Sequence, residues 1–432
     1  MNEQEMIIDS ESKLKKNIVR LLLLTVCASV IYGLPYMRWL FYEPFIEQYQ
    51  LTNEQLGLLG SAYGFFGLIS YLLGGVLADK FSAKKLVCFS LLATGAGGIV
   101  HYFTASYAVL LSIYAIWGLT SLLTFWPALI KAVRLTGGSK EQSRVFGIFE
   151  GGRGLVYTVN DSTAVAVFGV AVTGFAMADT MGFKFGILYY SAVTIIMGVL
   201  CIFILKETEV EKVDKTKFEW GNVKEALKLP AIWMIAFILC CTYAMNISYS
   251  YFNPYSINVF GASTVQAAML VALAQYVRPF SAPGAGFLAD RIGRPNIMRL
   301  GFSIMAVGTA ISIVLPSSTD IILLYVLCAV IYVGMYMNYG VVFSLMDEGG
   351  IPLKVSGTAI GIVCTIGYLP EVICPFLAGR LIDTYDEGLG FKFYFSGIIV
   401  MMIIGIVLIQ IWKRKRASGT SVEPDATSVS EG

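Results

Sequence analysis

The sequence has little charge, a single histidine and no paired cysteines. Asp, Glu, Lys and Arg together make up 14% of its 432 residues, whereas soluble proteins carry roughly 25%. Its eight cysteines form no C-x-x-C pair, and zinc sites and disulfide frameworks need other patterns. We therefore expect no metal site and no cofactor. The shortage of charge excludes a disordered chain and an ordinary soluble enzyme.

The residue patterns typical of enzymes and of nucleic-acid-binding proteins are also missing. The sequence shows no nucleophile–base set and no phosphate-binding loop, so we do not expect an enzyme. The net charge of +2 gives no sign of nucleic-acid binding. Apolar residues predominate instead: 56% of the residues are hydrophobic, and the mean hydropathy is +0.71. This composition indicates an integral membrane protein.

The apolar residues fall into twelve stretches, each about long enough to cross a bilayer, which takes about 20 residues. They predict an all-α membrane protein with twelve transmembrane helices, near residues 18–42, 56–78, 86–104, 107–130, 144–172, 184–205, 231–255, 265–289, 297–316, 320–346, 356–380 and 391–412.

A charged segment divides these stretches into two sets of six. We predict a short N-terminal segment whose first span is retained, since it lacks the cleavage site of a secretory signal. We also predict a linker between the halves and a polar, disordered tail. The expected parts are 1–17, 18–205 for the first half, 206–230 for the linker, 231–412 for the second half, and 413–432 for the tail.

The positive charges predict the orientation of the chain. If the N-terminus is cytoplasmic, 25 of the 31 Lys and Arg residues fall on the cytoplasmic side, and only Lys184, Arg380 and Lys392 fall on the other. Cytoplasmic loops are enriched in these residues. We therefore expect a multi-pass protein of the cytoplasmic (inner) membrane with both termini inside.

Two motifs occur once in each half. The run from Gly75 to Lys85, GVLADKFSAKK, returns as GFLADRIGR from Gly286, at an offset of 211 residues. Similarly, Tyr42-Glu43-Pro44 returns as Phe252-Asn253-Pro254 at an offset of 210. A chain of twelve spans with this repeated loop resembles the major facilitator superfamily of secondary transporters.

The resemblance implies two pseudo-symmetric six-helix halves that rock around a central site. It also implies that the repeated loop helps to close the cytoplasmic side. There Asp79 would meet Ser356 and Gly357, Asp290 would meet Ser143, and the two glycines would allow close helix approach. In the other interpretation, these loops only carry the positive charge that sets the orientation. The implied gating residues are Gly75, Asp79, Lys80, Gly286, Asp290, Arg291 and Arg294.

Ionisable residues inside the spans point to a site, because each costs about 2.5 to 3.5 kcal/mol at a helix centre. Arg153 and Arg278 lie near the middle of the fifth and eighth spans, in opposite halves, and predict a clamp for an anion. Glu150 lies one turn from Arg153, and Glu371 lies in the eleventh span; both are candidates for proton coupling. The other candidate substrate-binding residues are Arg38, Tyr36, Tyr63, Tyr249, Gln275 and Tyr368.

Simpler interpretations of these residues stay open. Glu150 and Arg153 could form a closed salt bridge, and Arg38 could extend to the membrane surface. Asp161 and His101 are expected at the membrane interface. Within the superfamily, the sequence around Glu150 and Arg153 resembles a bacterial group near the organic-anion and phosphate-ester transporters. It departs from the phosphate-ester antiporters, since the seventh span carries no arginine.

These observations favour a secondary active transporter that moves a small organic anion by alternating access. The anion would be a carboxylate, a sugar acid or a sugar phosphate, and a proton or a counter-substrate would be the coupling species. The expected partners are therefore this solute, the coupling species and the lipid bilayer, with the protein acting as a monomer. Two alternatives are a proton-coupled carrier of a sugar or other neutral solute, and a membrane sensor on a transporter fold.

Overall fold

The computed structural model describes residues 13–138, 141–206, 220–351, 356–385 and 388–417. For residues 71–80, 142–143, 220–223, 347, 356–358 and 417 it describes the backbone alone. The described residues form helices joined by short loops and contain no strand. This agrees with the predicted all-α membrane fold.

The first half holds the helices from α2 to α10. In chain order they are α2 (Lys13–Val30), α3 (Gly33–Leu40), α4 (Tyr42–Tyr49), α5 (Asn53–Lys80), α6 (Ala83–Phe103), α7 (Tyr107–Gly118), the π-helical turn η1 (Leu119–Phe125), α8 (Trp126–Arg134), α9 (Gln142–Gly169), η3 (Val170–Gly174) and α10 (Asp179–Ile204).

The second half follows a short helix, α11 (Trp220–Leu227), that lies in the linker. Its helices are α12 (Pro230–Ser248), η4 (Tyr249–Tyr251), α13 (Phe252–Phe260), α14 (Thr264–Ile292), α15 (Arg294–Val314), α16 (Ile321–Val341), η5 (Val342–Ser344), α17 (Leu345–Glu348), α18 (Ser356–Gly367), α19 (Pro370–Thr384) and α20 (Leu389–Ala417).

Ten of the twelve predicted spans correspond to described segments that are both long and apolar enough to cross a membrane. Nine segments of the described chain are long and apolar enough to cross a membrane, and the pair α2 and α3, bent by 46°, makes a tenth. The helices α5 and α14, of 28 and 29 residues, are also long enough at about 1.5 Å per residue. Many outward-facing side chains are large and apolar, for example Phe203, Phe280 and Phe287, which suits contact with lipid.

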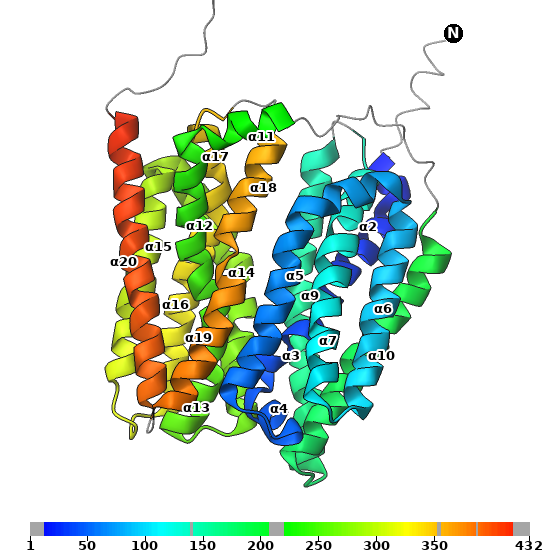
Figure 1. Ribbon diagram of the computed structural model, residues 1–432, viewed down its shortest axis with the longest axis vertical. Coiled ribbons are helices and arrows are strands. Elements are labelled where there is room, and N and C mark those ends of the chain that lie inside the picture. The colour runs from blue at the N-terminus through cyan, green and yellow to red at the C-terminus, as the bar shows by residue number, and fades with distance from the viewer. Residues whose placement is uncertain (1–12, 139–140, 207–219, 352–355, 386–387, 418–432) are drawn as a thin grey trace, which may run out of the picture.

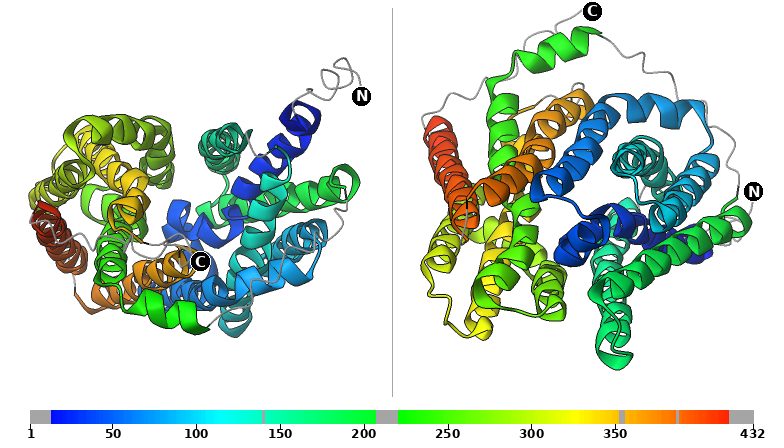
Figure 2. Two further views of the ribbon diagram at one scale, coloured as in Figure 1. Left: turned by 90° about the horizontal axis from the view of Figure 1, so that it is seen from above. Right: turned by 60° about the horizontal axis from the view of Figure 1, so that its bottom comes forward.

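The two halves form two groups of helices that lie side by side (Figure 2, left). The start of α2 and the end of α20 lie at the same end of the molecule, at the top of Figure 1. We call this the terminal end and the other the opposite end. The repeated Pro44 and Pro254 each lie in the first turn of a short helix, α4 and α13, at the opposite end (Figure 1).

Prolines break the helical ladder at defined points. Pro127 begins α8 directly after the π-helical turn η1, and the eleventh span is interrupted between α18 and α19 before Pro370. In α14, Pro279 has no N–H to donate to the carbonyl of Gln275 four residues earlier. The hydroxyl of Thr158 on α9 lies 3.0 Å from that carbonyl and shares its one hydrogen between it and the carbonyl of Gly154, also at 3.0 Å. A side chain of one half thus supplies a hydrogen bond to a helix of the other half.

At the opposite end, α5 packs closely against α19 through glycines. An added Cβ at Gly64 would lie 2.6 Å from Glu371 Cγ, and one at Gly60 would lie 2.8 Å from Arg38 Cζ. At Gly57 it would collide with the backbone of Pro375. These distances are shorter than real Cβ contacts, so only glycine allows the two helices to approach here.

Hydrogen bonds between the halves gather at this same end. Asn253 Nδ2 donates to the carbonyl of Leu40 at 2.7 Å, and Asn258 Nδ2 donates to Glu43 Oε1 at 2.7 Å. The side chain and backbone N–H of Asn53 both donate to the carboxylate of Asp383. The described contacts thus hold the halves together at the opposite end and leave the cavity between them unsealed by such bonds at the terminal end.

We predict that Gly64→Leu opens the opposite end. Forcing a side chain into a packed contact costs about 1 to 3 kcal/mol, so the open population should rise about tenfold. The measurement is the rate at which a water-soluble maleimide labels a cysteine placed at Ala378, which is buried on α19. The matched control is Gly397→Leu on α20, where an added Cβ meets nothing within 4 Å. Equal labelling of both variants, with both folded, would contradict the prediction.

Candidate functional site

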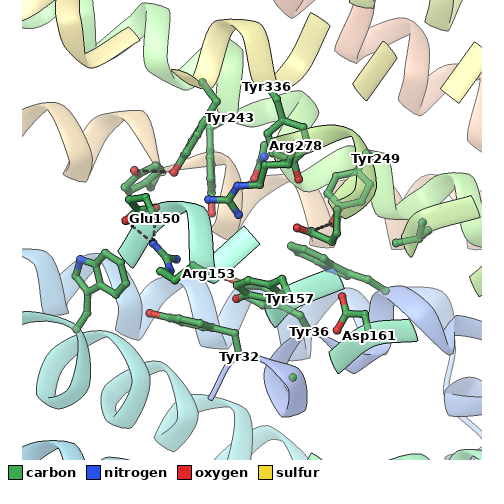
Figure 3. A pocket seen from close by; sticks show the side chains of 18 of the residues that line it. Tyr32, Tyr36, Glu150, Arg153, Tyr157, Asp161, Tyr243, Tyr249, Arg278 and Tyr336 are labelled. Atoms are coloured by element: carbon green, nitrogen blue, oxygen red, sulfur yellow. Dashed lines mark hydrogen bonds and ion pairs between the residues drawn. The ribbon is translucent and has the colours of Figure 1, made fainter. Parts of the chain in front are cut away.

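A cavity of about 420 Å³ lies between the two halves, and both contribute to its lining. Figure 3 shows its side chains, which are mainly aromatic with a few charged and amide groups. The charged and aromatic lining residues include Tyr32, Tyr36, Trp39, Trp126, Glu150, Arg153, Tyr157, Asp161, Tyr190, Tyr243, Tyr249, Arg278, Tyr336, Tyr339 and Tyr368.

Arg153 and Glu150 form an ion pair in this cavity, one turn apart on α9. Arg153 Nη1 donates to both carboxylate oxygens of Glu150, at 2.8 and 3.0 Å. The guanidinium also lies over the Trp126 ring, 4.7 Å from its centroid. The Arg153 side chain is 10% exposed and that of Glu150 is 49% exposed. The arginine is therefore held in place, while the carboxylate remains open to solvent.

Arg278 reaches the cavity from α14, in the other half. Its guanidinium lies 5.6 Å from the centroid of the Tyr336 ring, and Figure 3 shows it extending toward the centre of the cavity. Among the described residues it makes no ion pair and no hydrogen bond. A cation in this position is ready to accept an anion, because guanidinium groups bind carboxylates and phosphates through paired N–H donors.

Four of the other predicted residues also line the cavity: Tyr36, Tyr249, Gln275 and Tyr368. Gln275 Nε2 lies 3.5 Å from the Tyr249 hydroxyl. Three predicted substrate-binding or coupling residues do not line it. Tyr63 is fully buried and its hydroxyl bonds Ser121 at 3.0 Å, so packing of the first half accounts for it.

Arg38 and Glu371 lie outside the cavity lining, between the halves near the opposite end. The prediction of Arg38 as a cavity residue is therefore wrong in this conformation, and it does not extend to the membrane surface, since it is 3% exposed. Its Nη2 lies 3.9 Å from Glu371 Oε1. The hydroxyls of Tyr243 and Tyr36 donate to the same carboxylate, at 2.5 and 3.3 Å.

Two residues expected at the membrane interface lie elsewhere. Asp161 lines the cavity, where its Oδ1 accepts a hydrogen bond from the Tyr190 hydroxyl at 3.1 Å. His101 is fully buried, and its ring lies 5.7 Å from that of Trp117. Both expectations were drawn from position along the helix, and position does not reveal which way a side chain faces. The lining residues Trp39, Trp126 and Tyr157 were not predicted, since aromatic residues at helical spacing also occur in membrane protein cores.

The repeated loop lies at the terminal end. Asp290 is exposed, and Arg294 donates to the carbonyl of Ser344 at 3.0 Å and lies 3.8 Å from Glu348. An added Cβ at Gly286 would meet nothing within 4 Å, so the expected close helix approach is absent here. The side chains of Gly75, Asp79, Lys80 and the expected partners Ser143, Ser356 and Gly357 lie outside the described set.

We predict that the Arg38–Glu371 pair stabilises this conformation. Glu371→Met leaves a buried guanidinium without its partner, which costs about 3 to 5 kcal/mol of unfolding free energy. The double variant Arg38→Met/Glu371→Met should recover most of that loss. Unfolding of the purified protein in detergent measures both. Arg380→Met is the control, because its pair with Glu54 is solvent-exposed and worth about 1 kcal/mol or less. A double variant no more stable than the single one would refute the pairing.

The geometry so far defines a class of protein: a multi-pass membrane protein with two six-helix halves around a central cavity. Comparison with known proteins defines the family. A family model described as Major Facilitator Superfamily matches residues 21–350. The chain therefore belongs to the major facilitator superfamily.

Individual relatives extend this. The inner membrane protein YihN of Escherichia coli is 31% identical, over 88% of this chain and 94% of its own length. The cis,cis-muconate transport protein of Acinetobacter baylyi is 27% identical, over 83% of this chain and 87% of its own length. A probable sulfoacetate transporter, SauU of Cupriavidus necator, is 23% identical, over 79% and 82%.

A solved structure has the same fold. It is a bacterial homologue of the human lysosomal transporter Spinster, in an inward-facing and unoccupied conformation. It matches with a TM-score of 0.76 and 14% identity, over 95% of this chain and 98% of that one. The architecture of the two halves is therefore that of known transporters.

Proposed function

We propose that this protein is a secondary active transporter of a small organic anion, which Arg153 and Arg278 bind between the halves. The observation that carries the proposal is the Arg278 guanidinium, which extends into the cavity without a counter-ion among the described residues. Arg153 faces the same cavity from the other half. Muconate and sulfoacetate, the solutes in the names of two relatives, are also organic anions.

The terminal end is the cytoplasmic side in this proposal. Positive residues gather there, at the start of α6 (Lys84, Lys85) and at the end of α20 (Lys413 to Arg416), and such residues remain inside. The opposite end, held closed by the α5–α19 contact, then faces outward, and the cavity is open to the cytoplasm in the inner membrane. Because one chain forms the whole cavity, a monomer is sufficient for transport.

Transport requires the closed end to open and the terminal end to close. Opening separates α5 from α19 and Arg38 from Glu371, and each charge then needs water or a proton in place of its partner. Closing the terminal end brings the loop residues Asp79 and Asp290 toward the opposite halves. There their carboxylates can lie against helix N-termini, which carry a partial positive charge.

The Glu150–Arg153 pair provides a route for proton coupling. In the empty cavity the pair satisfies both charges. When an anion binds Arg153, Glu150 loses that partner, and a bound proton removes the cost of its unpaired charge. Since the Glu150 side chain is 49% exposed, it can take this proton from the open side. Glu371 is a second proton-coupling candidate, at the closed end.

The first functional prediction concerns the substrate. Purified protein in proteoliposomes should take up carboxylates, sugar acids or sugar phosphates in preference to uncharged sugars and nucleosides. Arg278→Gln should lower uptake at least about tenfold, because a charged hydrogen-bonded contact is worth about 1.5 to 3 kcal/mol. Arg278→Lys should retain little more uptake than Arg278→Gln, since an ammonium lacks the planar pair of donors.

The matched control is Arg299→Gln, an exposed arginine on α15 bonded to Gln410. It should transport as the parent does. Uptake of a neutral solute alone would favour the sugar-carrier alternative. Ligand binding without uptake would favour a sensor. Wild-type anion affinity in folded Arg153→Gln and Arg278→Gln variants would exclude the proposed clamp.

The second functional prediction concerns the proton. In Glu150→Gln the side chain keeps its shape but cannot bind or release a proton. Anion binding and anion exchange should persist, while the pH dependence of net uptake should disappear. Measuring uptake and exchange from pH 5 to pH 8 tests this. Net uptake that keeps its pH dependence in Glu150→Gln would rule out Glu150 and leave Glu371 to be tested in the same way.

A further inference from the structure

One part of the cavity carries hydrogen-bond acceptors without donors. Asp161 accepts one hydrogen bond, from Tyr190 to Oδ1, and the described residues offer its carboxylate no other donor. Gln275 is 8% exposed, and its Oε1 is buried with no partner among the described residues. For Gln275 Oε1 the missing donor costs about 1 to 3 kcal/mol, and such buried groups in native structures normally have a partner. Asp161 is partly exposed, so its second carboxylate oxygen is accessible to a donor in the cavity.

These acceptors lie away from the Glu150–Arg153 pair. Asp161 follows Arg153 by eight residues on α9, which places it about 12 Å further along the helix. Figure 3 shows Asp161 and Tyr249 at one side of the cavity and Glu150 and Arg153 at the other. The bond from Thr158 to the carbonyl of Gln275 joins α9 and α14 at this level. Asp161 and Gln275 therefore belong to the same acceptor end.

Aromatic rings lie between the two ends. Tyr36 and Tyr157 lie between Arg153 and Asp161 in Figure 3, and the Tyr36 ring packs on that of Trp39, with 4.1 Å between centroids. Such rings pack against the C–H faces of a flexible or cyclic carbon chain. The cavity thus has a cationic end, an aromatic middle and an acceptor end.

We propose that the transported anion carries hydroxyl groups at the end remote from its charge, as a sugar acid does, and that these donate to Asp161 and Gln275. This inference deepens the proposed function and rests on it. Hydroxyls suit this end because each can donate to one acceptor and also accept from a neighbouring tyrosine hydroxyl. A dicarboxylate of equal length would place a second negative charge beside Asp161, so Asp161 selects against it.

The test compares carboxylates of six carbons. Dissociation constants of the full chain in detergent are measured for gluconate and galactonate, which carry hydroxyls, and for hexanoate, adipate and 6-aminohexanoate. The hydroxylated acids should bind at least about tenfold more tightly than the other three, the value of one good hydrogen bond to a charged group. Asp161→Asn should reduce the discrimination against adipate about tenfold. Gln275→Met should weaken gluconate or galactonate and leave hexanoate unchanged.

Asp320→Asn is the matched control, because Asp320 is an exposed helix cap outside the cavity and asparagine caps equally well. Equal binding of hexanoate and the hydroxylated acids, or the same adipate discrimination in Asp161→Asn, would overturn the inference. Tighter binding of 6-aminohexanoate would do so too, assigning an ammonium to Asp161. The proposed function fails separately, if no carboxylate binds or if Arg278→Gln leaves the binding of all five unchanged.

Discussion

The constraint on which this structure depends is the free-energy cost of a charged side chain inside the bilayer without a partner. Arg38 and Glu371 show its consequences, because they belong to different halves and, among the described residues, neither has an ionic partner in its own half. Their pairing requires the halves to meet closely, and α5 supplies that approach with glycines facing both side chains. Two tyrosine hydroxyls also donate hydrogen bonds to the Glu371 carboxylate. This ion pair joins the halves at the closed end, beside the hydrogen bonds that Asn253, Asn258 and Asn53 make across the same interface.

The same constraint distinguishes the buried ion pair at the closed end from the charges that remain accessible in the cavity. Arg38 and Glu371 are almost inaccessible, whereas in the cavity Glu150 is half exposed and Arg278 has no counter-ion among the described residues. Tyr36 and Tyr243 belong to both sets, since they line the cavity and also donate to Glu371. In the proposed transport cycle, a solute that attracts either hydroxyl would weaken the hydrogen bonds to Glu371 at the closed end. Binding and opening would then be connected through these two side chains.

The sequence predicted much of the fold, because its signals are local. Long apolar runs predict spans, and the repeated loop predicts two similar halves, as observed. The approximate depth of the charged residues in the membrane could also be predicted from the sequence. The direction each side chain faces could not, since it depends on helix rotation and on breaks such as the bend after Val30. For this reason Arg38 was predicted to bind substrate and Asp161 to lie at the membrane interface, whereas Arg38 lies outside the cavity lining and Asp161 belongs to it.

The bond between Thr158 and the carbonyl of Gln275 has a consequence for the motion of the halves. Pro279 cannot supply the donor that this carbonyl needs, so α14 depends on α9 for it. Moving the two helices apart would leave a buried carbonyl unpaired, whereas turning one half about this contact leaves the bond intact. In the proposed transport cycle this contact would act as a pivot beside the cavity, and the ends of the helices would move much farther than the residues at the level of Gln275.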